Sequence, residues 1–189
     1  MKKYEFTGET KEIRLLFRTV TLHRIRATVA FGIVEVGDLG GWIEKEENLS
    51  HEGKAWVWGN AKVCGDAKVC GDAEVCGDAE VWGNAKVCGD AKVCGDAKVC
   101  GDAKVFSASH VLVIGAIGSR NDFTTFYRDK DNEITVKCGC FLGKIDRFLE
   151  KVTQTHGDSK YALVYRAAVE VAKLQIDLSG EAPKDADEE

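Results

Sequence analysis

The sequence predicts a mainly β protein, in which a parallel β-solenoid is followed by a small hairpin and two helices. The first observation is a six-residue unit, Ala-Lys-Val-Cys-Gly-Asp, which repeats with few changes through residues 61–105. The second is that four extended residues in each unit place Ala and Val on one side and Lys and Cys on the other. The third is a change of pattern after residue 118, where a hairpin precedes two amphipathic helical stretches within 143–176.

Each unit up to residue 102 ends in Gly-Asp or Gly-Asn, which predicts a turn because Gly adopts positive φ at little cost. A four-residue strand is unstable alone, but nine successive units can wind into coils that hydrogen-bond about 4.8 Å apart. The interior is then expected to hold alternating Ala and Val from Ala55 and Val57 to Ala103 and Val105. The same phase is expected at Ser109, Val111, Gly115 and Ile117. Upstream, Leu49 is aligned with Ala55 and His51 with a Val position, which predicts a degenerate first coil.

A small residue and a branched aliphatic residue repeated every six positions are typical of hexapeptide β-helices. The chain resembles the left-handed β-helix of hexapeptide-repeat proteins, which implies three units in each triangular coil. A two-sided coil of twelve residues stays open as an alternative. Eighteen-residue coils place Glu80 between Lys62 and Lys98, but they also align Lys68 with Lys86, so charge pairing does not decide the coil size.

The expected boundaries follow these patterns. Residues 1–48 form an N-terminal cap of short strands and the degenerate coil, with core residues Trp42, Ile43 and Leu49, because open solenoid edges need covering. Residues 49–118 form the hexapeptide β-helix, residues 119–178 a C-terminal α+β cap, and residues 179–189 a disordered acidic tail. In the C-terminal cap we expect a hairpin turn at 129–132 and a helix stop at Gly157. The buried stripes are expected at Ile145, Phe148, Leu149 and Val152, and at Tyr161, Tyr165, Ala168, Ala172 and Ile176.

One outward position of the repeat holds six cysteines and three aromatic residues, Trp58, Trp82 and Phe106. Eighteen-residue coils stack Cys70 on Cys88 and Cys76 on Cys94. The favoured interpretation is that cysteine fills an apolar slot, with a thiolate metal site and disulfides as alternatives. Reduced thiols are expected in the absence of an export signal. The aromatic residues are expected to form an assembly surface, and the hexapeptide resemblance implies a homotrimer.

Over most of its length the chain resembles a group of phage and prophage proteins of gut-type bacteria that brings no assigned activity. The resemblance is carried by HRIRATVAFGIVEVGDLGGWIEKEENLSHEGKAWVWGNA, by GAIGSRNDFTTFYR and by CGCFLGKIDRFLEKVTQTHGDSKYALVY. It implies a phage origin and adds support to the predicted architecture.

Composition limits the partners. A net charge of −5 argues against nucleic-acid binding. No apolar run is long enough for a signal peptide or a membrane span, so we expect the protein in the host bacterial cytoplasm, with a location in the virion left open.

The pair Cys138 and Cys140 lacks the C-x-x-C spacing of zinc and redox motifs. No metal or cofactor is expected.

The candidate ligand site is the junction between the solenoid and the C-terminal cap, because such junctions form clefts. Arginine with hydroxyls and backbone amides suits a phosphate or carboxylate. The alternative is a plain junction turn in which the arginine binds backbone carbonyls. The residues expected in this site are Ser119, Arg120, Asn121, Thr124, Thr125, Arg128 and His110.

His110 is expected on the outward lysine column of the last coil, where it could face a subunit cleft as a general base. The alternative is an ordinary surface residue. The function predicted from these patterns is a non-enzymatic, phage-encoded, trimeric structural or binding module. Two alternatives are a protein that sequesters a host nucleotide signal and a hexapeptide-type acyltransferase. The acyltransferase is disfavoured because no loop interrupts the nine repeats.

Overall fold

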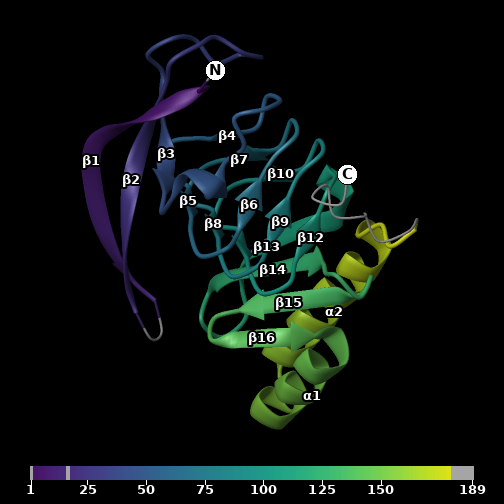
Figure 1. Ribbon diagram of the computed structural model, residues 1–189. Coiled ribbons are helices and arrows are strands. Elements are labelled where there is room, and N and C mark those ends of the chain that lie inside the picture. Colours follow the sequence, from purple (N-terminus) through teal and green to yellow (C-terminus); the bar gives the residue numbers. More distant parts are fainter. Residues whose placement is uncertain (1, 16–17, 180–189) are drawn as a thin grey trace.

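Three parallel sheets form the sides of a β-solenoid of about four turns (Figure 1). The computed structural model describes residues 2–15 and 18–179. The first sheet contains β3 (Leu39–Ile43), β5 (Lys62–Val63), β8 (Glu80–Val81) and β11 (Lys98–Val99). The second contains β4 (Trp56–Val57), β7 (Glu74–Val75) and β10 (Lys92–Val93). The third contains β6 (Lys68–Val69), β9 (Lys86–Val87) and β12 (Lys104–Val105).

The strand pairing fixes the size of the coil. Val63 lies opposite Val81 and Val75 opposite Val93, so each unit pairs with the third unit after it. The Lys62 ammonium is 3.0 Å from Glu80, across a separation of 18 residues. The three-sided coil is therefore confirmed, and the twelve-residue alternative is wrong. The like-charge column also exists, since Lys68 pairs with Lys86 and Lys86 with Lys104.

The interior of the solenoid is the predicted column of alternating Ala and Val. Every repeat Ala and Val from Ala55 to Val105 is buried. At the corners the repeat glycines adopt positive φ, for example +66° at Gly71 and +63° at Gly89. An L side chain rarely takes this conformation, which explains why the corner keeps Gly in the first eight of the nine units.

The first coil is longer than the others. Ile43 lies opposite Val63 and Leu49 opposite Val69, so both occupy the Val position of the repeat. The predicted alignment of Leu49 with Ala55, and of His51 with a Val position, is therefore wrong. His51 instead lies in the extra chain between Leu49 and Ala55, and its ring stacks on Tyr4 with centroids 4.3 Å apart.

A long antiparallel hairpin, β1 (Tyr4–Arg14) and β2 (Thr19–Ala27), extends the first sheet through the pairing of β2 with β3 (Figure 1). The sequence predicted only short strands here, because the mostly polar β1 shows little apolar alternation. The hairpin contributes Val20 and Leu22 to a small buried cluster with Trp42 and Cys64. The first sheet is thus the side of the solenoid whose outer surface is partly covered.

At the other end the repeat phase stops at Val105. A short 3-10 helix, Ala108–His110, leads into an antiparallel sheet of β13 (Val111–Ile117), β14 (Asp122–Arg128), β15 (Ile134–Cys138) and β16 (Phe141–Lys144). The predicted continuation of the solenoid through Val111 and Ile117 is therefore wrong. The predicted hairpin with its turn at 129–132 is confirmed as β14 and β15.

Two helices, α1 (Ile145–His156) and α2 (Lys160–Gln175), pack on this sheet and form a second core with Phe126 and Val136. The predicted stripe of α1 and the stop at Gly157 are confirmed. In α2 the predicted stripe is buried except for Tyr161, which is exposed. The predicted acidic tail lies outside the described residues, apart from Ser179.

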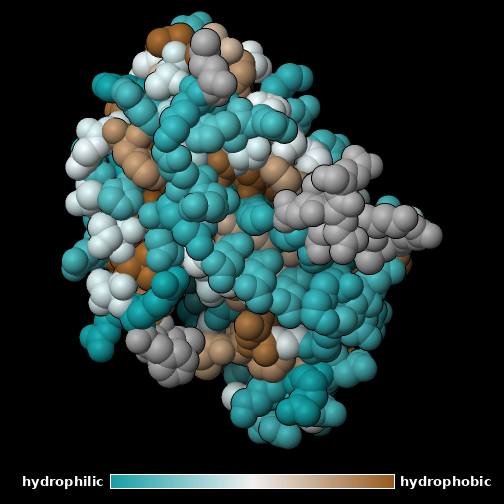
Figure 2. Space-filling view, in the orientation of Figure 1, coloured by the Kyte–Doolittle hydropathy of each residue, from teal (hydrophilic) through white to brown (hydrophobic). Residues whose placement is uncertain are grey.

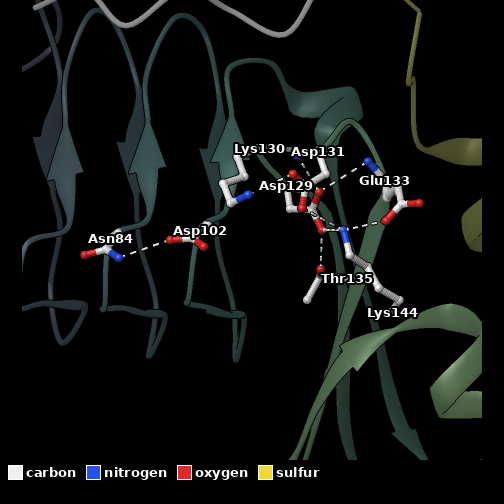
Figure 3. Close-up of polar contacts among 8 residues, drawn as sticks. All are labelled: Asn84, Asp102, Asp129, Lys130, Asp131, Glu133, Thr135 and Lys144. Atoms are coloured by element: carbon white, nitrogen blue, oxygen red, sulfur yellow. Dashed lines mark hydrogen bonds and ion pairs between the residues drawn. The ribbon is translucent and has the colours of Figure 1, made fainter.

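A network of charges surrounds the buried Asp129 where β14 ends (Figure 3). Its carboxylate accepts hydrogen bonds from the Asp131 N–H at 3.0 Å, from the Glu133 N–H at 3.3 Å and from the Thr135 hydroxyl. Lys144 from β16 supplies the countercharge through a short ion pair with Asp129, and it lies 2.7 Å from Glu133. Lys144 thus closes the hairpin turn by compensating a buried carboxylate.

We expect Lys144→Met to lower the free energy of unfolding by about 2 kcal/mol, because a buried charge would lose its charged hydrogen-bond partner. Urea denaturation followed by circular dichroism measures this difference. The matched control is Lys130→Met in the same turn, because the ion pair of Lys130 with Asp131 is exposed and contributes little. An equal effect of the two substitutions would contradict this role of Lys144.

Candidate anion-binding groove

A groove with a volume of about 1070 Å³ lies where three parts of the chain meet. Arg14, Leu15 and Arg18 come from the tip region of the β1–β2 hairpin. Glu80, Trp82 and Lys98 come from the outer surface of the first sheet. The third wall is the C-terminal sheet, which contributes Arg120, Asp122, Lys137, Gly139 and Cys140. Figure 1 shows the hairpin reaching toward the β15–β16 turn, and the surface in Figure 2 is hollowed between these two parts.

The groove carries an excess of positive charge. Five of its lining residues are cationic and two are acidic, which gives a difference of three charges. Glu80 is paired with Lys62 and Arg18 with Glu44, and both partners lie outside the lining residues, so these two pairs leave the difference unchanged. In a protein whose net charge is −5, such a local excess selects for an anionic ligand.

Trp82 gives the groove an aromatic surface. It takes the outward cysteine position on the first sheet, between Cys64 and Cys100 of the adjacent coils, and its indole is half-buried. Burial raises the pKa of Cys64 to about 11 and also raises the pKa of Cys100, so neither thiol is a reactive thiolate at neutral pH. On this wall of the groove, the Trp82 indole therefore offers an aromatic surface for contact with a ligand, and the two thiols offer no reactive group.

Arg120 enters the groove from the tight β13–β14 turn. The turn is closed by a hydrogen bond from the Asn121 N–H to the Gly118 carbonyl at 3.3 Å. The Arg120 guanidinium lies over Gly139, at a place where any side chain on that glycine would collide with it. Lys137 donates a hydrogen bond to the carbonyl of the same glycine. Two cations therefore converge on Gly139 in the β15–β16 turn.

The structure divides the residues that the sequence placed at this junction. Arg120 lines the groove, whereas Ser119 and Asn121 are exposed in the same turn without lining it. Thr124 and Thr125 are buried. Thr125 accepts a hydrogen bond from the Lys98 N–H at 3.0 Å, and Thr124 donates to Cys138 Sγ at 3.3 Å. Thr125 therefore joins the sheet to the last coil, and Thr124 links two strands within the sheet. Both are buried and not available to a ligand.

His110 and Arg128 form a buried pair beneath the end of the solenoid. His110 Nδ1 accepts a hydrogen bond from the Phe106 N–H at 3.1 Å, and its Nε2 lies 3.2 Å from Arg128 Nη1. Burial, and then the neighbouring guanidinium, hold the pKa of His110 below its ordinary value. The prediction that His110 faces outward on the lysine column is wrong, because the residue ends the 3-10 helix that follows the last coil.

The predicted assembly residues lie on three different sides of the solenoid. Trp82 is on the first sheet, Trp58 on the second and Phe106 on the third, each just after a strand of that sheet. They therefore share no single flat surface, and the face in Figure 2 shows hydrophobic residues as separate patches among hydrophilic ones. Trimer formation stays a prediction.

Four of the stacked cysteines are joined across adjacent coils. Cys70 bonds to Cys88 and Cys76 to Cys94, and each pair has Cα atoms 4.5 Å apart. The favoured interpretation of all six as reduced apolar filler is wrong for these two pairs, because coil stacking brings their Cα atoms within disulfide range. It holds for Cys64 and Cys100, which remain buried thiols.

Sequence reasoning missed Arg14, Arg18, Lys98 and Lys137 as groove residues. No sequence pattern indicates that the hairpin pairs with the first sheet. The sequence therefore could not predict that the hairpin arginines line the same groove as Arg120. Trp82 stands where the repeat usually has Cys, and this exchange could have indicated a binding surface. The sequence analysis instead interprets Trp82 as part of an assembly surface.

Among the described residues, no group of three or more His, Cys, Asp or Glu side chains could hold a metal ion. No helix in the described part of the chain is long and apolar enough to cross a membrane. No model of a known protein family matches the chain, and a search of curated proteins finds no relative.

Proposed function

We propose that this protein is a non-enzymatic binding module that captures a small anionic molecule with an aromatic ring, of the nucleotide class, in the groove. The observation that carries the proposal is the convergence of five cations around Trp82. Guanidinium groups bind phosphate oxygens in a bidentate manner, and a tryptophan face stacks on a base whatever its identity.

The size of the groove supports a ligand larger than one mononucleotide. Ligand cavities commonly have volumes of about 300–1,000 Å³, and this groove has about 1070 Å³. The cations also come from both of its sides, with Arg14 and Arg18 on the hairpin and Arg120 and Lys137 on the C-terminal sheet. This spacing favours a ligand with more than one phosphate.

Sequestration of a nucleotide signal fits this proposal better than group transfer does. Sequestration needs affinity alone, and the cations and the Trp82 indole of the groove supply it. The acyltransferase alternative depended on His110, which is buried and occupied by the Phe106 N–H and Arg128. A phage origin and a trimeric assembly are part of the proposal and rest on the sequence resemblances alone.

We expect Arg120→Gln and Trp82→Leu each to weaken nucleotide binding by about ten- to a hundredfold. A charged hydrogen bond contributes about 1.5–3 kcal/mol, and stacking of a base on an aromatic side chain contributes about 1–3 kcal/mol. The measurement is titration of the protein with cyclic and linear nucleotides that differ in phosphate number, followed by calorimetry. Arg147→Gln is the matched control, because Arg147 lies on α1 away from the groove and is exposed.

Native mass spectrometry of protein from a bacterial cytoplasm would identify a co-purified ligand. Nucleotide binding that Arg120→Gln leaves unchanged would reject the groove as the site. Absence of binding to every nucleotide tested, with no co-purified anion, would reject the proposed function.

A further inference from the structure

The third sheet differs from the other two in the charges of its outer surface. On the first sheet, Glu80 is paired in register with Lys62 on one side and Lys98 on the other. On the second sheet, Glu74 is paired with Lys92. The third sheet has lysine at this position in all three of its strands, and we call these residues the third-sheet lysines: Lys68, Lys86 and Lys104. They form a row of like charges on strands about 4.8 Å apart.

This row is partly shielded from water. Each of the third-sheet lysines is half-buried, whereas Lys92 and Lys98 on the other two sheets are exposed. Lys62 is also half-buried, and its ammonium is 3.0 Å from the Glu80 carboxylate of the adjacent strand. Like charges repel more strongly when they are partly removed from water, so the row attracts an anionic segment in the way that Lys62 attracts Glu80.

The described part of the chain ends close to this row. Asp177 donates a hydrogen bond through its N–H to the Ser109 carbonyl at 3.0 Å, within the 3-10 helix that follows β12. Asn132 donates to the Leu178 carbonyl at 2.8 Å, so two successive residues are held in place. Figure 1 shows the end of α2 and β12 on the same side of the molecule. Residues 180–189 therefore begin beside the last strand of the third sheet.

These following residues have the complementary charge and a sufficient length. Residues 180–189 contain one lysine and five acidic residues, namely Glu181, Asp185, Asp187, Glu188 and Glu189. Ten residues extend to at most about 33–36 Å. The row covers two strand spacings, which is about 10 Å. The segment is thus long enough to run from the end of α2 along all three lysines.

We propose that the acidic segment 180–189 binds along the outer surface of the third sheet, with its carboxylates against the third-sheet lysines. It supplies to this sheet the negative charge that Glu80 and Glu74 supply to the other two. The proposal goes beyond ligand capture, because none of the third-sheet lysines lines the anion-binding groove. The segment is an intramolecular strap that links the C-terminal cap to the coils of the solenoid.

Carbodiimide crosslinking of the unmodified protein tests this contact, since the reagent joins a carboxylate to an amine without a spacer. We expect peptides from 180–189 to be joined to the third-sheet lysines and not to Lys92, which is the control on the second sheet. At a salt concentration of about 1 M the coupling should be largely lost, because the screening length falls to about 3 Å. Coupling to Lys98 or Lys137 instead would place the segment in the groove and overturn the proposal, and so would equal coupling to Lys92 or no coupling at all.

An equal mixture of ¹⁵N-labelled and unlabelled protein distinguishes the protein's own segment from that of a second copy. Crosslinked pairs that are uniformly labelled or uniformly unlabelled are expected. Mixed pairs in the statistical proportion would assign the row to a neighbouring molecule and overturn the intramolecular contact.

A variant with a neutral segment of the same length gives an independent readout. It combines Asp185→Asn, Asp187→Asn and Glu188→Gln, and we expect acetylation of the third-sheet lysines to become several-fold faster while that of Lys92 is unchanged. The matched control neutralises three exposed carboxylates on and between the helices, and therefore has the same net charge: Glu150→Gln, Asp158→Asn and Glu170→Gln. Equal acetylation rates in the two variants would contradict a bound acidic segment.

Discussion

Reduction of the two disulfides is expected to lower the free energy of unfolding by about 3 kcal/mol for the first bond broken. A disulfide that closes a loop of about 15–20 residues lowers the entropy of the unfolded chain by about this amount of free energy. Cys70–Cys88 and Cys76–Cys94 each span 18 residues, which is one coil. The two loops overlap in sequence, so the second bond removes less additional freedom from the unfolded chain than the first. We expect a combined loss of about 4 to 5 kcal/mol.

Guanidinium denaturation with and without a reducing agent measures this loss, and the double variant Cys70→Ser with Cys76→Ser should reproduce it. The control is Cys140→Ser, because Cys140 is a free, exposed thiol and its removal should leave the midpoint unchanged. If reduction does not move the midpoint, the coils are held by their hydrogen bonds and core alone. Thiol labelling of the protein unfolded without a reducing agent gives a direct count, since only the four unpaired cysteines should retain a thiol.

The solenoid could be predicted because its restraints are local and repeated. Alternation of Ala and Val fixes which side of each strand is buried, and Gly fixes each corner, so an error in one unit is corrected by the next. At the first coil this redundancy ends. The extra chain after Leu49 moves that residue from the Ala position to the Val position, and no neighbouring repeat reveals the change.

The groove could be predicted only in part, because its walls are brought together by contacts between distant segments. Arg120 was identified from its place at the junction, and it does line the groove. Arg14 and Arg18 reach the same groove only because β2 pairs with β3, and register between two such strands is decided by tertiary packing around Leu22 and Trp42. Thr124, Thr125 and Arg128 satisfied the same chemical criteria as Arg120, but they are buried in structural contacts. Thr125 attaches the C-terminal sheet to the last coil, Thr124 bonds to Cys138 within that sheet, and Arg128 contacts His110.

The cysteine column illustrates the same limit. The repeat gave the stacking of Cys70 on Cys88, but whether a stacked pair is bonded depends on side-chain direction and redox conditions, which the pattern does not contain. Trp82 has a clearer consequence. By standing between Cys64 and Cys100, it keeps these two thiols on non-adjacent coils and leaves an aromatic surface beside Lys98 in the groove.

Gly89→Ala is expected to destabilise the protein by about 3 to 4 kcal/mol, through two separate effects. Gly89 has a φ of +63°, where an L side chain costs about 1–2 kcal/mol. A methyl group at this position would also collide with the carbonyl oxygen of Phe106 in the adjacent coil. Overpacking against a fixed backbone adds about 1–3 kcal/mol. The coil spacing, which is set by the hydrogen bonds between strands, leaves the backbone no direction in which to move cheaply.

Gly95→Ala separates the two effects, because Gly95 has nearly the same φ, +69°, and nothing within 4 Å of the added methyl group. We expect this variant to lose only the conformational part, about 1–2 kcal/mol. Urea denaturation of both variants gives the difference, which is the cost of crowding between coils. Equal losses would mean that the solenoid relaxes around the extra methyl group. In that case the presence of Gly in eight of the nine repeats would follow from backbone conformation alone, and coil spacing would play no part in selecting it.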